Sequence, residues 1–319
     1  MPRFLTERDV FLIERTPESG PLETVSALPC TPWKRDSEGD RVAGGRPKGP
    51  LPCGRGSVSG RGSVRSATIE GVGQRLGQHF LFDNSILERI ALAGCGEHSA
   101  TVIEIGPGPG GLTAHLLPHC DRLVAVELDP ALAGALRERY AGEPKFELVE
   151  SDVLQADLSR WGPAVVVGNI PYYITSPIVD RALSLGPLLL RAVFLVQKEV
   201  ADRLAAAPGS RDYGYLSVST QARCTAKVLF SVKRGSFRPP PKVESAVVLL
   251  EPLAEPVCDD LDGFLQFASV CFRQKRKTLR NNLADVFERA KIDALPEASG
   301  RAEQLSVGEL ARIFNILKV

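Results

Sequence analysis

The 319-residue chain has little of what would indicate a membrane protein, a secreted protein or a metal site. It has no run of about eighteen apolar residues, and its first thirty residues mix acids with arginines, unlike a signal or transit peptide. Its seven cysteines are scattered, odd in number and free of any CxxC pair, which argues against a disulfide framework or a zinc site. We therefore expect a cytoplasmic protein without a bound metal or membrane contact, and a monomer by default.

Methionine is also scarce, occurring only at residue 1. Residues 43–64 consist mainly of glycine, proline, serine and arginine with almost nothing to bury, so we expect residues 1–70 to be a disordered extension. A non-standard start codon, for example at Val64, would delete only this low-complexity sequence. The alternative is therefore that the true start lies further along the chain.

From about residue 75, strand and helix patterns alternate. Helical spacing occurs at 85–94, 111–117 and 130–140, and buried strand patterns occur at 100–108, 121–129, 145–152, 164–169, 192–197, 227–232 and 245–252. This alternation predicts an α/β fold with a mostly parallel, doubly wound sheet, in which ligands bind at the carboxyl ends of the strands.

A glycine-rich loop follows the first of these strands. Gly106, Gly108 and Gly111 form the pattern G-x-G-x-x-G before a helix, which lets a nucleotide approach the backbone. A nicotinamide cofactor would have the same pattern, with Glu127 at the end of the next strand binding ribose hydroxyls. The two prolines in the loop, and Asp152 placed to accept from an adenine amino group, favour S-adenosyl-L-methionine. The alternative is that Glu127 and Asp152 are solvated acids at strand ends and bind no ligand.

The stretch Asn169 to Tyr172, Asn-Ile-Pro-Tyr, ends the strand at 164–169 and carries the predicted catalytic residues. An exocyclic adenine nitrogen is a poor nucleophile because its lone pair is delocalised into the ring. Hydrogen bonds to the Asn169 side-chain oxygen and the Ile170 carbonyl would orient that nitrogen. Pro171 would hold the turn, and Tyr172 would stack on the flipped base. Without the glycine loop, a simple turn would be the better interpretation.

Seven blocks of the sequence together resemble the ribosomal RNA adenine N6-dimethyltransferases, most closely the branch that acts on the bacterial small subunit. The blocks are RLGQHFLFD (75–83), EIGPGPGGLT (104–113), VELD (126–129), SDVL (151–154), GNIPYYITSPI (168–178), FRPPPKVESAVV (237–248) and FRQKRKTLRNNL (272–283). The resemblance implies a Rossmann-like class I methyltransferase domain at 71–252 and a helical rRNA-binding domain at 253–319. It also implies dimethylation of two adjacent adenines near the 3′ end of 16S rRNA.

The same resemblance assigns the cofactor contacts. In the family, S-adenosyl-L-methionine is contacted by the segment before the first helix and by strand-end positions, here His79, Leu81, Gly106, Glu127, Asp152 and Asn169. The glycine loop adds Gly108. His79 departs from the family pattern, which has asparagine there, although an imidazole can replace an amide hydrogen bond.

The C-terminal region carries the predicted RNA contacts. In FRQKRKTLR, five basic residues occur without an acid on an expected helix, which suits phosphate neutralisation: Arg273, Lys275, Arg276, Lys277 and Arg280. A solvated basic face is the alternative interpretation. Phe237 and the prolines after it are expected to form a stiff loop beside the target base, or else a simple turn.

Together these features predict a methyltransferase that acts on adenine N6 of 16S rRNA in a pre-30S particle. Three alternatives remain open. One is a large-subunit rRNA adenine methyltransferase of the antibiotic-resistance type. Another is an RNA-binding assembly factor without turnover, against which the intact Asn-Ile-Pro-Tyr stretch argues. The third is a nicotinamide dehydrogenase, which would leave Asp152 and that stretch unexplained.

Overall fold

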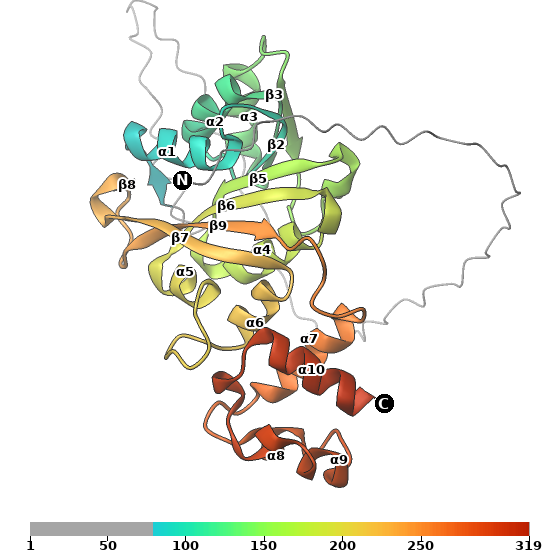
Figure 1. Ribbon diagram of the computed structural model, residues 1–319. Coiled ribbons are helices and arrows are strands. Elements are labelled where there is room, and N and C mark those ends of the chain that lie inside the picture. The colour runs from blue at the N-terminus through green and yellow to red at the C-terminus, as the bar shows by residue number, and fades with distance from the viewer. Residues whose placement is uncertain (1–78, 319) are drawn as a thin grey trace, which may run out of the picture. The chain divides into compact units, whose positions relative to one another are not determined.

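The computed structural model describes residues 79–318 (Figure 1). The predicted disordered extension, residues 1–70, lies outside the described residues. Within residues 79–318, no helix combines the length and the apolar character needed to cross a bilayer.

Residues 79–318 form two sheets, and the larger has seven strands in the order β4-β3-β2-β5-β6-β9-β7. β2 to β6 are mutually parallel, whereas β9 runs antiparallel to both β6 and β7. The strands are β2 (Ser99–Ile105), β3 (Cys120–Glu127), β4 (Phe146–Glu150), β5 (Ala164–Asn169), β6 (Leu189–Gln197), β7 (Cys224–Val232) and β9 (Ser245–Pro252). The predicted Rossmann-like fold is confirmed, and the strand order reverses between β2 and β5, where such sheets bind their ligands.

Helices pack on both faces of this sheet (Figure 1). They are α1 (Asn84–Cys95), α2 (Gly111–Leu116), α3 (Pro130–Arg139), α4 (Thr175–Leu183), α5 (Lys198–Leu204) and α6 (Tyr215–Gln221). Two helix starts follow directly from the sequence. The Asp83 carboxylate accepts from the Ser85 N–H to cap α1, and Asp129 caps α3 just before Pro130.

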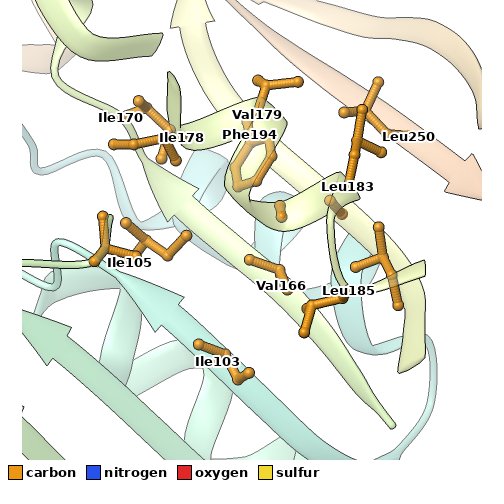
Figure 2. Close-up of a cluster of buried hydrophobic side chains, with 14 of the residues drawn as sticks. Ile103, Ile105, Val166, Ile170, Ile178, Val179, Leu183, Leu185, Phe194 and Leu250 are labelled. Carbon is orange, nitrogen blue, oxygen red and sulfur yellow. The ribbon is translucent and has the colours of Figure 1, made fainter. Parts of the chain in front are cut away.

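Alternate residues of each strand supply two separate cores, as the two-residue period of a strand requires. Val165 and Val167 of β5 pack with α1 and α2, whereas Val166 packs on the opposite face with α4 and α5. Figure 2 shows this second core, in which Phe194 of β6 lies among side chains of α4 such as Ile178. Each fully buried side chain of this size contributes roughly 1.5–3 kcal/mol to folding, so the two cores fix the strand ends firmly.

A third hydrophobic cluster joins the C-terminal helices α7 (Leu261–Cys271), α8 (Leu279–Leu283), α9 (Arg289–Asp293) and α10 (Val307–Lys318). Phe264 and Phe267 of α7 pack against Phe314 of α10. Tyr213 and Val218, from the α6 region, are buried in the same cluster. This helical cluster therefore includes residues before 253, the boundary at which we predicted the C-terminal domain to begin.

The basic stretch FRQKRKTLR is not the helix that we expected. α7 ends at Cys271 and α8 begins at Leu279, so Arg273 to Lys277 lie in the connecting loop. Only Arg280 lies on a helix. The basic side chains therefore project from a turn and do not form one helical face.

A small antiparallel pair lies outside the main sheet. β1 (Phe80–Leu81) pairs with β8 (Phe237–Arg238), with Phe80 opposite Arg238 and Leu81 opposite Phe237. Because directly opposite residues share a face, Leu81 and Phe237 are buried together, in the core that contains α1. The Phe237 side chain is only 2% exposed, so it is not available to contact a base itself; that its loop lies beside the target base stays a prediction.

Candidate active site

The glycine loop lies where the strand order reverses. Gly106 and Gly108 have φ values of 64° and 57°, in the left-handed region that favours glycine. At Gly108 an added Cβ would lie 2.9 Å from the Phe80 ring. Gly168, at the end of β5, is equally restricted, because its Cβ would lie 2.8 Å from the Ile105 carbonyl oxygen. These glycines let the ends of β2, β5 and β1 approach one another.

Glu127, at the end of β3, is 2% exposed and its carboxylate accepts three backbone hydrogen bonds. Oε2 accepts from Gly108 N–H at 3.0 Å, and Oε1 accepts from Leu128 and Asp129 N–H at 3.0 and 2.9 Å. Burial raises the pKa of Glu127, and these three N–H donors oppose that rise. The side chain thus joins the glycine loop to the start of α3.

Asp152 lies two residues beyond β4. Its Oδ1 accepts from the Leu154 N–H at 2.9 Å, while Oδ2 has no hydrogen-bond partner within residues 79–318. One carboxylate oxygen is therefore available to accept from a ligand. Leu128 leaves an apolar side chain 54% exposed directly after Glu127, a feature that our sequence reasoning missed.

Asn169 ends β5 with a fixed side-chain orientation. Its Nδ2 donates to the His79 carbonyl at 2.9 Å. Because a carbonyl only accepts, the amide nitrogen must face His79, and Oδ1 remains an available acceptor. A hollow open to solvent lies here, lined by His79, Phe80, Gly106, Gly108, Asn169, Ile170, Pro171 and Tyr172. The structure thus brings together the glycine loop, His79 and all four residues of Asn-Ile-Pro-Tyr.

Ile170 and Tyr172 are each held by a hydrogen bond to a strand of the main sheet, β6 for Ile170 and β9 for Tyr172. The Ile170 side chain is buried in the core shown in Figure 2, and its N–H donates to the Leu195 carbonyl at 3.0 Å. Within the described residues, its own carbonyl accepts no hydrogen bond. The Tyr172 hydroxyl hydrogen-bonds Ser245 Oγ at 2.5 Å, and burial raises the pKa of Tyr172. Both residues therefore present fixed groups to the hollow.

His79 connects the hollow to the proline-rich loop after β8. Its Nδ1 donates to the Pro239 carbonyl at 2.8 Å. The ring centroid lies 5.6 Å from that of Tyr172. The imidazole therefore lines the hollow, and its contact with the cofactor stays a prediction.

Our sequence reasoning missed Glu104, in β2 just before the glycine loop. It is 1% exposed, Thr113 Oγ1 donates to its Oε2 at 2.6 Å, and its Oε1 has no partner within residues 79–318. Burial raises the pKa of Glu104 to about 8. A second hollow is lined by this carboxylate together with Leu81, Gly106 and Asn169. The signal in the sequence was an acid among the apolar residues Val102, Ile103 and Ile105 at the end of this strand.

The predicted RNA-binding residues are not part of the hollow. Lys275 Nζ donates to the Arg211 carbonyl at 2.6 Å, and Arg280 pairs with Asp293 at 2.9 Å. Arg273, Arg276 and Lys277 are exposed, and they form no ion pair within the described chain. Their binding of RNA stays a prediction. Among residues 79–318, no three His, Cys, Asp or Glu side chains are arranged to hold a metal ion.

The glycine loop and the Asn-Ile-Pro-Tyr turn occur together in a known protein family. The family model described as Ribosomal RNA adenine dimethylase matches residues 72–319. The chain belongs to this family. As a ribosomal RNA adenine dimethylase it is a methyltransferase, and its cofactor is S-adenosyl-L-methionine.

Relatives of this dimethylase have bacterial and eukaryotic sources. The chain is 41% identical over 249 residues to Ribosomal RNA small subunit methyltransferase A of Chlorobium chlorochromatii, covering 77% of this chain and 93% of that protein. The corresponding protein of Koribacter versatilis is 42% identical over 267 residues, covering 76% and 94%. Among solved structures, a dimethyladenosine transferase from Plasmodium falciparum is 27% identical with a TM-score of 0.67, covering 76% and 99%. The 23S rRNA methyltransferase ErmE is 30% identical with a TM-score of 0.62, covering 75% and 100%.

Proposed function

We propose that this dimethylase modifies N6 of two adjacent adenines near the 3′ end of 16S rRNA, in a pre-30S particle in the cytosol. We also propose that it acts as a monomer. The observation that carries the catalytic part is the orientation of Asn169, whose amide nitrogen is held by the His79 carbonyl at 2.9 Å so that Oδ1 is free to accept.

The choice of the small subunit rests on the relatives. The small-subunit methyltransferases are 41–42% identical to this chain, whereas the 23S rRNA methyltransferase ErmE is 30% identical. Both the small-subunit methyltransferases and ErmE match about three quarters of this chain and more than nine tenths of their own length. A large-subunit substrate is therefore the alternative that the experiment below must separate.

The residues around the two hollows fit the cofactor. When bound, S-adenosyl-L-methionine supplies an electrophilic methyl group on a sulfonium. The unpartnered Oε1 of Glu104 would accept from the ammonium group of its methionine part. A carboxylate has about four acceptor positions. Glu127 uses three of them on backbone N–H groups, which leaves one for a ribose hydroxyl.

The adenine end of the cofactor has its own candidates. Asp152 has a carboxylate oxygen without a partner in the described chain, which would accept from the adenine amino group. Leu128 is 54% exposed at the neighbouring strand end and would cover a face of the ring. His79 and Leu81 are the remaining candidate cofactor contacts. His79 lines the first hollow and Leu81 lines the second.

The catalytic residues act by positioning. An adenine amino group has two hydrogens, and two acceptors at the hollow are free: Asn169 Oδ1 and the Ile170 carbonyl oxygen. Accepting both hydrogens orients the nitrogen lone pair away from the two acceptors and makes it more nucleophilic. Pro171 fixes the turn, and the Tyr172 ring, held by Ser245, would stack on the flipped base.

The proposal is tested with purified 30S and 50S particles from cells that lack dimethyladenosine, methylated by the full-length protein with labelled S-adenosylmethionine. We expect dimethyladenosine only in 16S rRNA, and a loss of at least a hundredfold for Asn169→Ala. Asn281→Ala, at an exposed position in α8, is the matched control and should retain full activity. Labelling of the 50S particle would overturn the substrate assignment, and full activity of Asn169→Ala would overturn the catalytic one.

A further inference from the structure

A strongly basic loop borders the active-site hollow, apart from the predicted RNA-binding residues of the C-terminal region. Lys233, Arg234, Arg238 and Lys242 are all exposed, and within residues 79–318 none of the four forms an ion pair. The only acid between positions 233 and 244 is Glu244. In contrast, Lys275 and Arg280 of the C-terminal cluster each lie near a carboxylate. Within the described residues, all four cations of the loop are thus without an ion-pair partner, whereas two of the five in that cluster have one.

An exposed aromatic ring lies against this loop. The Arg238 guanidinium stacks over the Phe82 ring at 4.4 Å from its centroid, and Phe82 remains 45% exposed. The ring and the guanidinium together present a planar, partly apolar, positively charged surface. Such a surface suits the face of a nucleobase, because bases stack on both aromatic rings and guanidinium planes.

The pairing of β1 with β8 places this surface next to the hollow. Arg238 lies opposite Phe80, and Phe80 lines the hollow with its ring against the glycine loop. The hydrogen bond from His79 to the Pro239 carbonyl, 2.8 Å long, joins the hollow to the residue after Arg238. Nucleotides beside a base bound at Asn169 would thus pass over Phe82 and Arg238.

We propose that Phe82, Arg238, Lys233, Arg234 and Lys242 form a docking surface for single-stranded RNA that flanks the target adenines. A flanking base stacks on the Phe82–Arg238 pair, and the other three cations neutralise neighbouring phosphates. This inference rests on the proposed function, since it gives the RNA substrate of that site a second contact on the catalytic domain. It also replaces the RNA contact that we had predicted for the buried Phe237.

A second arginine–aromatic pair, Arg160 and Trp161, differs from the Phe82–Arg238 pair in its surroundings. Arg160 lies over the Trp161 ring at the same 4.4 Å, but it also lies 3.3 Å from Glu147. It precedes β5, at the edge of the sheet opposite to Asn169. Trp161 is buried, at 6% exposure, whereas Phe82 is 45% exposed. Arg160→Ala therefore removes an exposed arginine that stacks on an aromatic ring without touching the proposed surface, and it serves as the matched control.

The test measures binding and turnover separately. Binding of a fluorescein-labelled single-stranded RNA of about ten nucleotides is followed by anisotropy at several salt concentrations. We expect Phe82→Ala and Arg238→Ala each to weaken binding at least fivefold. The pair Lys233→Ala with Arg234→Ala should lower the salt slope by about 1.4, the single-strand value for two phosphate contacts. Arg238→Lys should keep the salt slope of the wild type while losing part of the affinity.

Turnover on 30S particles gives the second readout. KM for the particle should rise at least fivefold in Phe82→Ala and Arg238→Ala, with kcat and the affinity for S-adenosylmethionine unchanged. Wild-type values of RNA affinity and KM in both variants would overturn the proposal, and so would an equal loss in Arg160→Ala. If the wild type binds RNA but methylates neither particle, the proposed function fails, while the anisotropy series still decides whether this surface binds RNA.

Discussion

Glu104 gives the sharpest stability prediction, because burial raises its pKa to about 8 from an ordinary value of 4.5. As the pH rises from 4.5, the unfolded chain loses this proton, whereas the folded protein retains it until about pH 8. The folded state is therefore progressively destabilised across this window. At about 1.36 kcal/mol per pKa unit, the loss amounts to roughly 3 kcal/mol by pH 7.

Glu104→Gln removes the proton while keeping an oxygen that accepts from Thr113. We expect the free energy of unfolding of the variant, measured with urea in the absence of cofactor, to fall less between pH 5 and pH 8 than that of the wild type, because only the contribution of Glu127, whose pKa is also raised, remains. The wild type should lose roughly 3–4 kcal/mol more than the variant over this range. Glu147→Gln is the control: the pKa of Glu147 is lowered, so its contribution is lost only at acid pH and stays constant between pH 5 and 8.

The same variant separates stability from function. The amide of Glu104→Gln has no charge to offer an ammonium group, so S-adenosylmethionine should bind at least tenfold more weakly by calorimetry at pH 8. Parallel pH profiles of unfolding for wild type and variant would refute the account of Glu104 as a buried, unpaired carboxyl. Unchanged cofactor affinity would refute its role in binding.

Three further variants test other parts of the site. Gly108→Ala combines a positive φ with a contact to the Phe80 ring, so we expect a loss of about 1–3 kcal/mol in unfolding free energy and weaker cofactor binding, both measured by thermal shift. Tyr172→Phe loses only the hydrogen bond to Ser245 and should retain most activity. Tyr172→Ala also loses the ring and should lose more than tenfold in kcat/KM on 30S particles. Equal losses in the two variants would contradict stacking of the ring on the target base. Lys277→Ala, in the exposed loop after α7, should weaken RNA binding and lower its salt slope by about 0.7, and an unchanged slope would show that this residue contacts no phosphate.

The strands of the sheet could be predicted because buried strands appear in the sequence as short apolar stretches. The stretches 164–169 and 245–252 were predicted with the boundaries that β5 and β9 have, since both are apolar and are bounded by clear turn signals. Polar residues that directly follow buried strands lie at one edge of a parallel sheet. From the sequence alone, this rule places Glu127, Asp152 and Asn169 at the same edge.

Features that depend on packing were not predictable in the same way. Phe237 is buried because it pairs opposite Leu81, a residue far away in the sequence. The basic stretch 273–277 has helical composition, but its chain is fixed by packing at both ends, where Cys271 and Leu279 are buried in the helical cluster. The available oxygen of Asn169 follows from a contact with the His79 carbonyl, which no local pattern reveals.

Mass-spectrometric nucleoside analysis of 16S rRNA tests the central claim most directly. Cells that lack the gene are complemented with the wild-type chain, with Asn169→Ala or with the control Asn281→Ala, at matched protein levels. We predict that dimethyladenosine returns with the wild type and the control but not with Asn169→Ala. Its return with Asn169→Ala, or its absence with the wild type, would contradict the account.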